Sequence, residues 1–462
     1  MSTSQPDYDV AVVGAGGAGL AAALEAARAG ARVLLVDAAG RTGGSTALSG
    51  GVYYAAGTSV QRARGIVDTP DALLHHYLTL NRHDLAPALA RKLCFEAAAN
   101  LEWLLGLGVE FRPEDLYNSG TDAVLRGHRP VGRGAAIAAA LDSAVSRGGV
   151  DVALNSRVSS LTRDAHGVVR GLCVGTERIS AHAVVLTTGG FGANRALLER
   201  YYPDAMSAPE WAWYIGVPEA RGDGLQLGLE AGATLTGQNR GLVLITHGFA
   251  HDNEPDMPGW LLHVNRGGRR FVKETTNYTV VAELVKLQTG RECFGLFDED
   301  ARLACVRATE RNPSWEASLL EGFVARGRLL RAPSLEVLAG LAGIERDALL
   351  HTVGTYNQAV ATGVDGEFFK DPAWLKPLAR PPFYAARFRP ATIALTSTGL
   401  AIDSATRVLD ARGAVIPGLY AAGETTGGVL GEIYAASGNS ITNAIVFGRT
   451  AGQSAALQAR QS

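Results

Sequence analysis

The chain has 462 residues, of which 47% are hydrophobic, so it can bury a large core, and its length predicts two or three domains. Lysine and arginine number 43 and aspartate and glutamate 45, a net charge of −2 without the basic excess that neutralises phosphates, so no nucleic-acid partner is expected. Glycine is the outlier, because 56 glycines are about 12% of the chain against an ordinary share of roughly 7%.

The N-terminal residues and the cysteines bear on the cellular compartment. The first nine residues show no positively charged segment followed by an apolar stretch, so no secretory signal is expected. No run approaches the ~18 apolar residues of a membrane span. Cys94, Cys173, Cys293 and Cys305 are scattered without a C-x-x-C pair, which favours reduced thiols over a zinc or iron–sulfur site. We therefore expect a cytoplasmic protein without a metal site.

The N-terminal part of the chain has the pattern of a parallel β-sheet. Tyr8–Val13 is an apolar run that predicts a strand, residues 18–29 form an alanine-rich helical run, and residues 32–36 predict a second strand. Strand, helix and strand in this order are the unit of a parallel sheet. Further elements are predicted at residues 87–107 and 135–146, as helices, and at 183–186, as a strand.

The composition changes from about residue 239. Arginine, tryptophan and glutamate become more frequent there, and glycine clusters become rarer. Residues 335–361 predict two helical segments. Short strands with glycine-rich turns then return at residues 400–402, 408–410 and 419–421, before a helix that begins near Asn439. This order predicts one α/β domain that is interrupted by an inserted domain.

A glycine-rich turn lies between the first predicted strand and helix. Gly14, Gly16 and Gly19 form the motif G-x-G-x-x-G. The first glycine permits a tight turn, the second lets the backbone approach a pyrophosphate, and the third allows close packing of helix on strand. Asp37 ends the second strand, where a carboxylate can accept hydrogen bonds from both ribose hydroxyls. These features predict a dinucleotide site but do not separate NAD from FAD.

Two further segments separate the two cofactors. They are R-T-G-G-S-T at residues 41–46 and G-L-Y-A-A-G-E at residues 418–424. Here the sequence resembles the flavoprotein family of soluble fumarate reductases, succinate dehydrogenase flavoprotein subunits and 3-ketosteroid dehydrogenases, along nearly the whole chain. In that family the cofactor is FAD. The glycine excess is concentrated at residues 14–57, 189–192 and 413–448, where the resemblance places this cofactor.

The resemblance implies which residues hold FAD. Glu424 would bind the ribityl chain, and Ser440 and Ile441 would open a helix whose positive N-terminus faces the flavin pyrimidine edge. The residues implied to line the pyrophosphate are Gly43, Gly44, Ser45 and Thr46, and further cofactor contacts are expected at Gly51, Val158, Gly189 and Gly423. Residues 41–51 lack the histidine of members with covalent flavin, so non-covalent FAD is expected.

Three positions that handle dicarboxylates in fumarate reductases differ in this chain. Those enzymes place a proton-donating arginine four residues after the glutamate of an R-F-x-x-E segment, whereas here residues 270–274 are followed by Tyr278. Residues 394–399 lack the histidine of their H-T-M-G-G segment, and residues 432–439 lack the arginine of their A-N-R-L-G-G-N segment. Because two carboxylates need fixed cationic partners, fumarate or succinate is not expected as the substrate.

The same positions resemble those of 3-ketosteroid dehydrogenases. Tyr278 matches the base tyrosine of their R-F-x-N-E-x-x-x-Y segment, although Lys273 replaces the asparagine. Tyr434 and Gly438 match a tyrosine and a glycine four residues apart, whose O–H and N–H both donate to the substrate ketone. The resemblance therefore implies that Tyr278, Tyr434 and Gly438 are the catalytic residues.

This assignment agrees with the chemistry of desaturation beside a ketone, which removes an α proton and a β hydride. Two donors on the carbonyl oxygen stabilise the developing enolate, Tyr278 would take the proton, and N5 of FAD would take the hydride. A tyrosine with the ordinary pKa of about 10 needs a neighbouring cation or second tyrosine, and Tyr117 is the candidate. The run R-G-H-R-P at residues 126–130, which includes Arg129, either binds a substrate carboxylate or braces the flavin domain.

The expected fold is α/β, with a Rossmann-like FAD-binding domain at residues 1–239 and 396–462 and an inserted α+β capping domain at 240–395. The expected activity is FAD-dependent dehydrogenation of a cyclic ketone, either a steroid or a smaller oxocyclohexane-type ring, with an external electron acceptor. Two alternatives remain open. One is an ene-reductase acting on another enone or unsaturated acid, and the other is a flavoprotein subunit of an electron-transfer complex.

Overall fold

The computed structural model describes residues 5–121, 124–249, 251, 257–305 and 314–461, and its contacts divide the chain into two compact units. Unit 1 comprises Met1–Asp204, Gly216–Leu242 and Ala394–Ser462, and unit 2 comprises Ala205–Ile215 and Val243–Ile393. The chain passes from unit 1 to unit 2 after residue 242 and back after residue 393, close to the expected boundaries at 239/240 and 395/396. Residues 205–215 also belong to unit 2, although they were expected in the domain segment 1–239. The roles of the two parts as FAD-binding and capping domains stay a prediction.

Unit 1 is built on a mostly parallel sheet with the strand order β17-β18-β8-β1-β2-β5. Its strands are β1 (Tyr8–Val13), β2 (Val33–Val36), β5 (Asp151–Ala153), β8 (Glu177–Leu186), β17 (Arg407–Leu409) and β18 (Val415–Ala421), extended by β6 (Val158–Arg163) and β7 (Val169–Val174) beside β8. β1 pairs in parallel with β2 and with β8, and every residue of β2 is buried. Strands buried on both faces read as continuous apolar runs, so the α/β prediction is confirmed.

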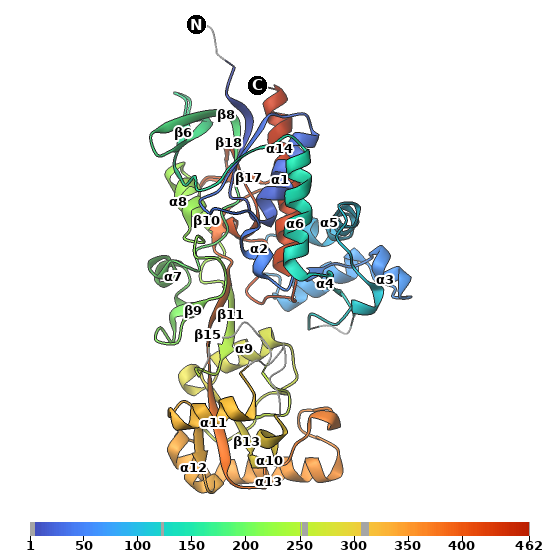
Figure 1. Ribbon diagram of the computed structural model, residues 1–462, viewed down its shortest axis with the longest axis vertical. Coiled ribbons are helices and arrows are strands. Elements are labelled where there is room, and N and C mark those ends of the chain that lie inside the picture. Colours follow the sequence, from blue (N-terminus) through green and yellow to red (C-terminus); the bar gives the residue numbers. More distant parts are fainter. Residues whose placement is uncertain (1–4, 122–123, 250, 252–256, 306–313, 462) are drawn as a thin grey trace. The chain divides into compact units, whose positions relative to one another are not determined.

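In the described part of unit 1 the α-helices are α1 (Gly17–Arg28), α2 (Gly44–Leu48), α3 (Ser59–Ala63), α4 (Pro70–Leu80), α5 (Pro87–Gly106), α6 (Arg133–Arg147), α7 (Arg195–Tyr201), α8 (Asp223–Glu230) and α14 (Asn439–Gln461). Helices α1 and α14 pack on the sheet and on each other, and α6 packs on α1 (Figure 1). Two short strand pairs, β3 (Tyr53–Tyr54) with β4 (Gly127–His128) and β10 (Leu235–Thr236) with β16 (Gly399–Leu400), complete the unit. The helices predicted at 87–107, at 135–146 and from Asn439 are confirmed.

The contact between α1 and α14 has no room for side chains. A Cβ atom on Gly448 would lie 2.4 Å from the carbonyl oxygen of Ala18, and one on Gly452 would lie 2.1 Å from that of Ala22. These two glycines of α14 therefore let its backbone rest directly on α1. Part of the glycine excess near the C-terminus thus serves helix packing rather than approach to a cofactor.

Unit 2 contains a second sheet with the order β11-β15-β13-β12, in which β9 and β14 also pair with β15. Its strands are β9 (Trp213–Tyr214), β11 (Gly241–Thr246), β12 (Leu262–Val264), β13 (Cys293–Asp298), β14 (Leu330–Ala332) and β15 (Phe383–Thr396), and its helices are α9 (Tyr278–Lys286), α10 (Glu299–Ala304), α11 (Ala317–Ala325), α12 (Leu335–Ala342) and α13 (Arg346–Thr362). β11 and β15 continue into unit 1 at residues 241–242 and 394–396.

The alternation of side chains along β13 explains why helices cover both faces of this second sheet. Phe294 and Leu296 belong to a core shared with α12 and α13, whereas Cys293 and Phe297 belong to a core shared with α9 and α11. Successive side chains of a strand point to opposite faces, so each face needs its own apolar cover. Within the described residues, no helix combines the length and apolar character needed to cross a bilayer.

Replacing Gly452 by alanine should destabilise the protein, because the new methyl group overlaps a backbone carbonyl of α1. Overpacking of this kind costs about 1–3 kcal/mol, visible as a lower midpoint of urea unfolding. Gly106→Ala is the matched control, because Gly106 is exposed at the end of α5 with nothing within 4 Å of the added atom. That change should be neutral or stabilise by up to about 1 kcal/mol. Equal effects of the two substitutions would contradict the packing argument.

Candidate functional site

The three motif glycines after β1 occupy three different environments. Gly14 has φ +106°, and a Cβ there would lie 2.4 Å from the carbonyl oxygen of Thr187. Gly19 is packed so closely that a Cβ would lie 1.7 Å from the carbonyl oxygen of Gly14. Gly16, in contrast, has no atom within 4 Å of a Cβ position. One glycine therefore makes the turn, one packs helix on strand, and the one between them leaves open space of the kind that a cofactor pyrophosphate needs.

The second glycine segment lies directly beside this turn. Gly43 has φ +102° and donates from its N–H to the carbonyl oxygen of Ala15 at 2.8 Å, and α2 starts at Gly44. The N–H of Gly17, at the start of α1, donates to the hydroxyl of Thr46 at 3.3 Å. The structure thus brings residues 43–46 and the N-terminus of α1 together, and the positive ends of two helices meet at one place.

Asp37 anchors the other side of the turn. Its carboxylate accepts hydrogen bonds from the N–H of Ala15 at 2.5 Å and from the N–H of Ala39 at 2.7 Å. The N–H of Ser156 donates to the backbone carbonyl oxygen of Asp37 at 2.7 Å. Strand β6 begins two residues later with the buried Val158. Carboxylate oxygens have further lone pairs, so Asp37 retains acceptor capacity for ribose hydroxyls.

Glu424 lies in a second cluster of glycine and threonine residues. One of its oxygens accepts hydrogen bonds from the N–H and hydroxyl groups of Thr396 at 2.8 and 3.0 Å. A Cβ on Gly190 would lie 2.2 Å from that oxygen, and one on Gly423 would lie 2.9 Å from the Cβ of Ala18 in α1. Burial raises the pKa of Glu424 to about 7. A buried carboxyl group that accepts few hydrogen bonds can accept more from the hydroxyl groups of a ligand, such as those of a ribityl chain.

Tyr434 lies against the N-terminus of α14. Its buried hydroxyl oxygen accepts the N–H of Ser440 at 2.9 Å and lies 3.0 Å from the Ser440 hydroxyl. Burial raises the pKa of Tyr434, so its phenol keeps the proton. A protonated phenol is a hydrogen-bond donor and not a base, as the predicted role requires.

Gly438 presents a backbone donor in the same place. It is buried with φ +102°, and a Cβ would lie 2.6 Å from the carbonyl oxygen of Val52, so only glycine fits. Within the described part of the chain, its N–H donates no hydrogen bond. The same holds for the N–H of Ile441 in the first turn of α14. Buried N–H groups almost always donate a hydrogen bond. These two are therefore positions where a bound molecule can accept one.

Tyr117 and Arg129 lie beside these donors. Tyr117 exchanges two backbone hydrogen bonds with Gly127, and the neighbouring Ser119 accepts the N–H of Ser437 at 2.9 Å. The Arg129 guanidinium carbon lies 4.6 Å from the centre of the Tyr117 ring. Tyr117 is also close enough to Tyr434 to contribute electrostatically to raising the pKa of that group.

The rest of the R-G-H-R-P run has a structural role. The Arg126 guanidinium donates two hydrogen bonds to the Asp68 carboxylate at 2.7 and 2.8 Å, and both side chains are buried. The His128 ring lies 2.8 Å from the Thr58 hydroxyl, and burial lowers the pKa of His128 to about 4, so it is neutral. The sequence left open whether residues 126–130 bind a substrate carboxylate or brace the domain. The contacts of Arg126 and His128 are of the bracing kind. Arg129 alone in this run is exposed.

Tyr278 belongs to unit 2, as the first residue of α9. The helix is capped by Asn277, whose side chain accepts the N–H of Thr279 at 3.0 Å. Tyr278 is half-buried, so its side chain is not part of the packed core. Its action together with Tyr434 and Gly438, which belong to unit 1, stays a prediction.

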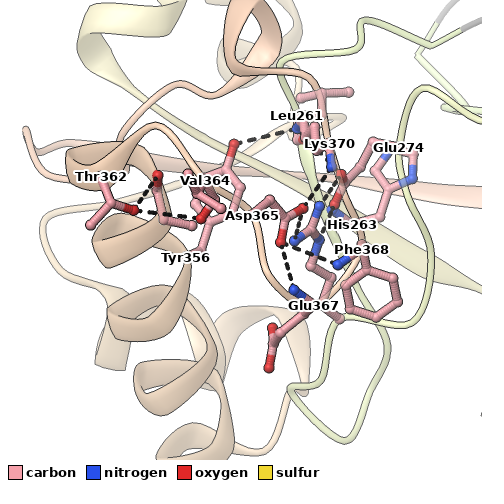
Figure 2. Close-up of polar contacts among 12 residues, drawn as sticks. Leu261, His263, Glu274, Tyr356, Thr362, Val364, Asp365, Glu367, Phe368 and Lys370 are labelled. Carbon is pink, nitrogen blue, oxygen red and sulfur yellow. Dashed lines mark hydrogen bonds and ion pairs between the residues drawn. The ribbon is translucent and has the colours of Figure 1, made fainter.

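A buried ionic network holds the segment that leads to Tyr278 (Figure 2). The Arg270 guanidinium forms a two-bond contact with Glu274, at 2.8 Å each, and lies 2.8 Å from Asp365. The Lys370 ammonium lies 3.3 Å from Glu274 and donates to the carbonyl oxygen of Leu261 at 2.8 Å. Burial lowers the pKa of Lys370 to about 8. Sequence reasoning found Arg270 and Glu274 but missed Asp365 and Lys370, since no local pattern links them to the motif.

Comparison with known proteins agrees with this geometry. The family model described as "FAD binding domain" matches residues 9–441, so the chain belongs to this family of FAD-binding flavoproteins. It is 32% identical to "Fumarate reductase (cytochrome)" of Shewanella frigidimarina, over 100% of this chain and 79% of that protein. It is 28% identical to "4-oxocyclohexanecarboxylate 2-dehydrogenase" of Sinomonas cyclohexanicum, over 99% and 94%.

A solved structure of a 3-ketosteroid-Δ4-(5α)-dehydrogenase from Rhodococcus jostii RHA1, in complex with 4-androstene-3,17-dione, is also similar. Its sequence is 27% identical, its TM-score is 0.82, and the match covers 98% of each chain. The predicted family, fold class and FAD cofactor are confirmed by these matches. The protein is an FAD-dependent oxidoreductase acting on carbon–carbon bonds.

Glu424→Gln should change how the stability of the FAD-free protein depends on pH. The folded-state pKa of about 7 lies above the ordinary 4.5, so the folded protein holds this proton more tightly than the unfolded chain. Wild type should therefore lose stability between about pH 4.5 and 7, and the variant should lack this component of the loss. Melting temperatures across that range test this, with the exposed Glu199→Gln as control. Parallel curves for wild type and Glu424→Gln would contradict it.

Glu274→Gln should strongly destabilise unit 2, because it removes the carboxylate that pairs with the buried Lys370 ammonium and leaves the buried Arg270 guanidinium paired with Asp365 alone among the described residues. Removing one member of a buried ionic network costs about 3–5 kcal/mol of unfolding free energy. Glu321→Gln is the control, because Glu321 forms a largely exposed pair with Arg331, and its loss should cost at most about 1 kcal/mol. Urea unfolding, monitored by tryptophan fluorescence, would measure the free energy of unfolding of both variants. Similar losses of free energy in the two variants would contradict a stabilising role of the network.

Proposed function

We propose that the protein is an FAD-dependent dehydrogenase that introduces a C=C bond next to the carbonyl group of a cyclic ketone. The observation that carries this proposal is the pair of donors at the start of α14, namely the Tyr434 phenol and the unpaired N–H of Gly438. Two donors that converge on one acceptor form the environment in which an enolate oxygen develops. The similarity to dehydrogenases of a 3-ketosteroid and of 4-oxocyclohexanecarboxylate supports this reading.

Tyr434 can donate to a ketone while its oxygen keeps the hydrogen bond from the Ser440 N–H. Its oxygen accepts the N–H of Ser440 at 2.9 Å, and its O–H donates to the Ser440 hydroxyl oxygen at 3.0 Å. In this proposal the phenol exchanges the second hydrogen bond for one to the substrate ketone and keeps the first, which polarises it. Gly438 donates its N–H to the same carbonyl oxygen, and the two hydrogen bonds acidify the adjacent α C–H.

Tyr278 receives the α proton at its phenolic oxygen in this proposal, while the hydride leaves the β carbon and the C=C bond forms between the two carbons. FAD, when bound, supplies the hydride acceptor at N5. The cofactor is held by the two glycine segments, Asp37 and Glu424. We propose that it is bound non-covalently, because residues 41–51 contain no histidine. Turnover would require an external electron acceptor, and a cytoplasmic location stays a prediction.

A second candidate is reduction of an enone or unsaturated acid by the same residues acting in reverse. The 32% identity to a fumarate reductase favours this direction. Against fumarate itself, residues 394–399 and 432–439 provide neither the histidine nor the arginine that two carboxylates need. Anaerobic mixing of the oxidised protein with a saturated ketone, and of the reduced protein with the matching enone, distinguishes the two directions.

Tyr278→Phe and Tyr434→Phe should each retain FAD but slow the anaerobic bleaching of the flavin band by a cyclic ketone. Loss of one oxyanion donor typically costs ~10²–10³-fold in rate, which is the effect expected for Tyr434→Phe. Loss of the base at position 278 should cost at least as much. Tyr8→Phe is the control, because its hydroxyl donates to the Asp151 carboxylate at 3.0 Å, away from the proposed catalytic residues. Unchanged bleaching in Tyr278→Phe, with normal flavin content, would remove that residue from the mechanism.

A further inference from the structure

Arg129 differs from the other arginine of its motif in having no carboxylate partner. Arg126 is buried against Asp68, whereas the exposed Arg129 forms no ion pair within the described residues. Its guanidinium carbon lies over the face of the Tyr117 ring, 4.6 Å from the ring centre. Stacking on an aromatic ring holds a guanidinium in place while leaving its N–H groups at the edges available to an anion.

The backbone places this cation beside the ketone donors. Tyr117 is tied to Gly127 by two hydrogen bonds, and Arg129 follows two residues later. On the other side, Gly120 forms a bridge with Ala436, and the N–H of Ser437 donates to Ser119. The segment that carries Tyr117 therefore runs alongside the segment that carries Tyr434 and Gly438. The segment of Tyr117 is thus paired both with the segment that leads to Arg129 and with the segment that leads from Tyr434 to Gly438.

We propose that Arg129, held by Tyr117, is the carboxylate subsite of this enzyme, and that its substrate is therefore a small alicyclic keto acid rather than a neutral steroid. This inference rests on the proposed function. The ketone oxygen accepts from Tyr434 and Gly438, and the carboxylate of the same ring accepts from the guanidinium. A neutral substrate would cover Arg129 without pairing it, at the cost of desolvating an uncompensated charge.

The test compares one ligand in charged and neutral form. Dissociation constants of 4-oxocyclohexanecarboxylate and its methyl ester are measured from the perturbation of the flavin spectrum of the oxidised holoenzyme. Arg129→Met should weaken binding of the acid roughly 10–100-fold, the usual effect of a hydrogen-bonded charge, and leave the ester nearly unchanged. Arg129→Lys should lie between, because lysine keeps the charge but loses the planar fork.

Variants of Tyr117 and Arg170 distinguish loss of the carboxylate subsite from a general loss of folded structure. Tyr117→Phe keeps the ring under the guanidinium and should bind the acid like wild type, whereas Tyr117→Leu should weaken it. Arg170→Met is the matched control, since Arg170 is an exposed arginine of unit 1 that pairs with Asp164. Its replacement should change neither dissociation constant.

The outcomes distinguish this inference from the proposed function. If Arg129→Met weakens the acid and the ester equally, weakens neither, or wild type does not bind the acid, the carboxylate subsite is overturned. If the acid binds in an Arg129-dependent way but neither probe bleaches the flavin, the subsite stands and the desaturation fails. If acid and ester bleach the flavin with equal efficiency in wild type and in Arg129→Met, the desaturation stands and the subsite is overturned.

Discussion

The contact of α14 with α1 is the constraint on which the rest of the proposed site depends. Gly448 and Gly452 let the backbone of α14 rest on the carbonyl groups of Ala18 and Ala22, at separations that a single methyl group would prevent. Each of the two helices begins at a functional segment. α1 starts at the glycine turn after β1, and α14 starts at Asn439, directly after Gly438. Their close packing therefore holds the proposed cofactor-binding turn and the proposed ketone donors in one arrangement.

Two buried ionic clusters differ in their consequences from the exposed Arg129. Arg126 with Asp68, and Arg270 with Glu274, Asp365 and Lys370, are buried and neutralise one another. Such groups hold segments in place, because breaking them leaves a charge in a medium that cannot solvate it. Arg129 remains exposed and has no acidic partner among the described residues, so its charge is available to a ligand.

The chain is similar both to a fumarate reductase and to a 3-ketosteroid dehydrogenase. Motif comparison predicts that neutral tyrosine and glycine donors stand where fumarate reductases have the cationic residues that bind a dicarboxylate. Neutral donors suit a ketone oxygen, which carries little charge until the enolate develops. In the proposed site, the single cation Arg129 matches a substrate with a single carboxylate, which is the charge pattern of a keto acid rather than of a diacid.

What the sequence determined by itself was largely local. The glycine turn, β1, α1 and β2 follow from short-range patterns. The catalytic roles of Tyr278, Tyr434 and Gly438 are predicted from short motifs. The tertiary structure decided which arginine of residues 126–130 is available, because Asp68 lies far from Arg126 along the chain. It also showed Asp365 and Lys370 beside Glu274, and the Ser440 N–H on Tyr434. Hydrogen bonds and ion pairs depend on which groups meet after folding, and residues distant in sequence leave no local pattern that predicts such meetings.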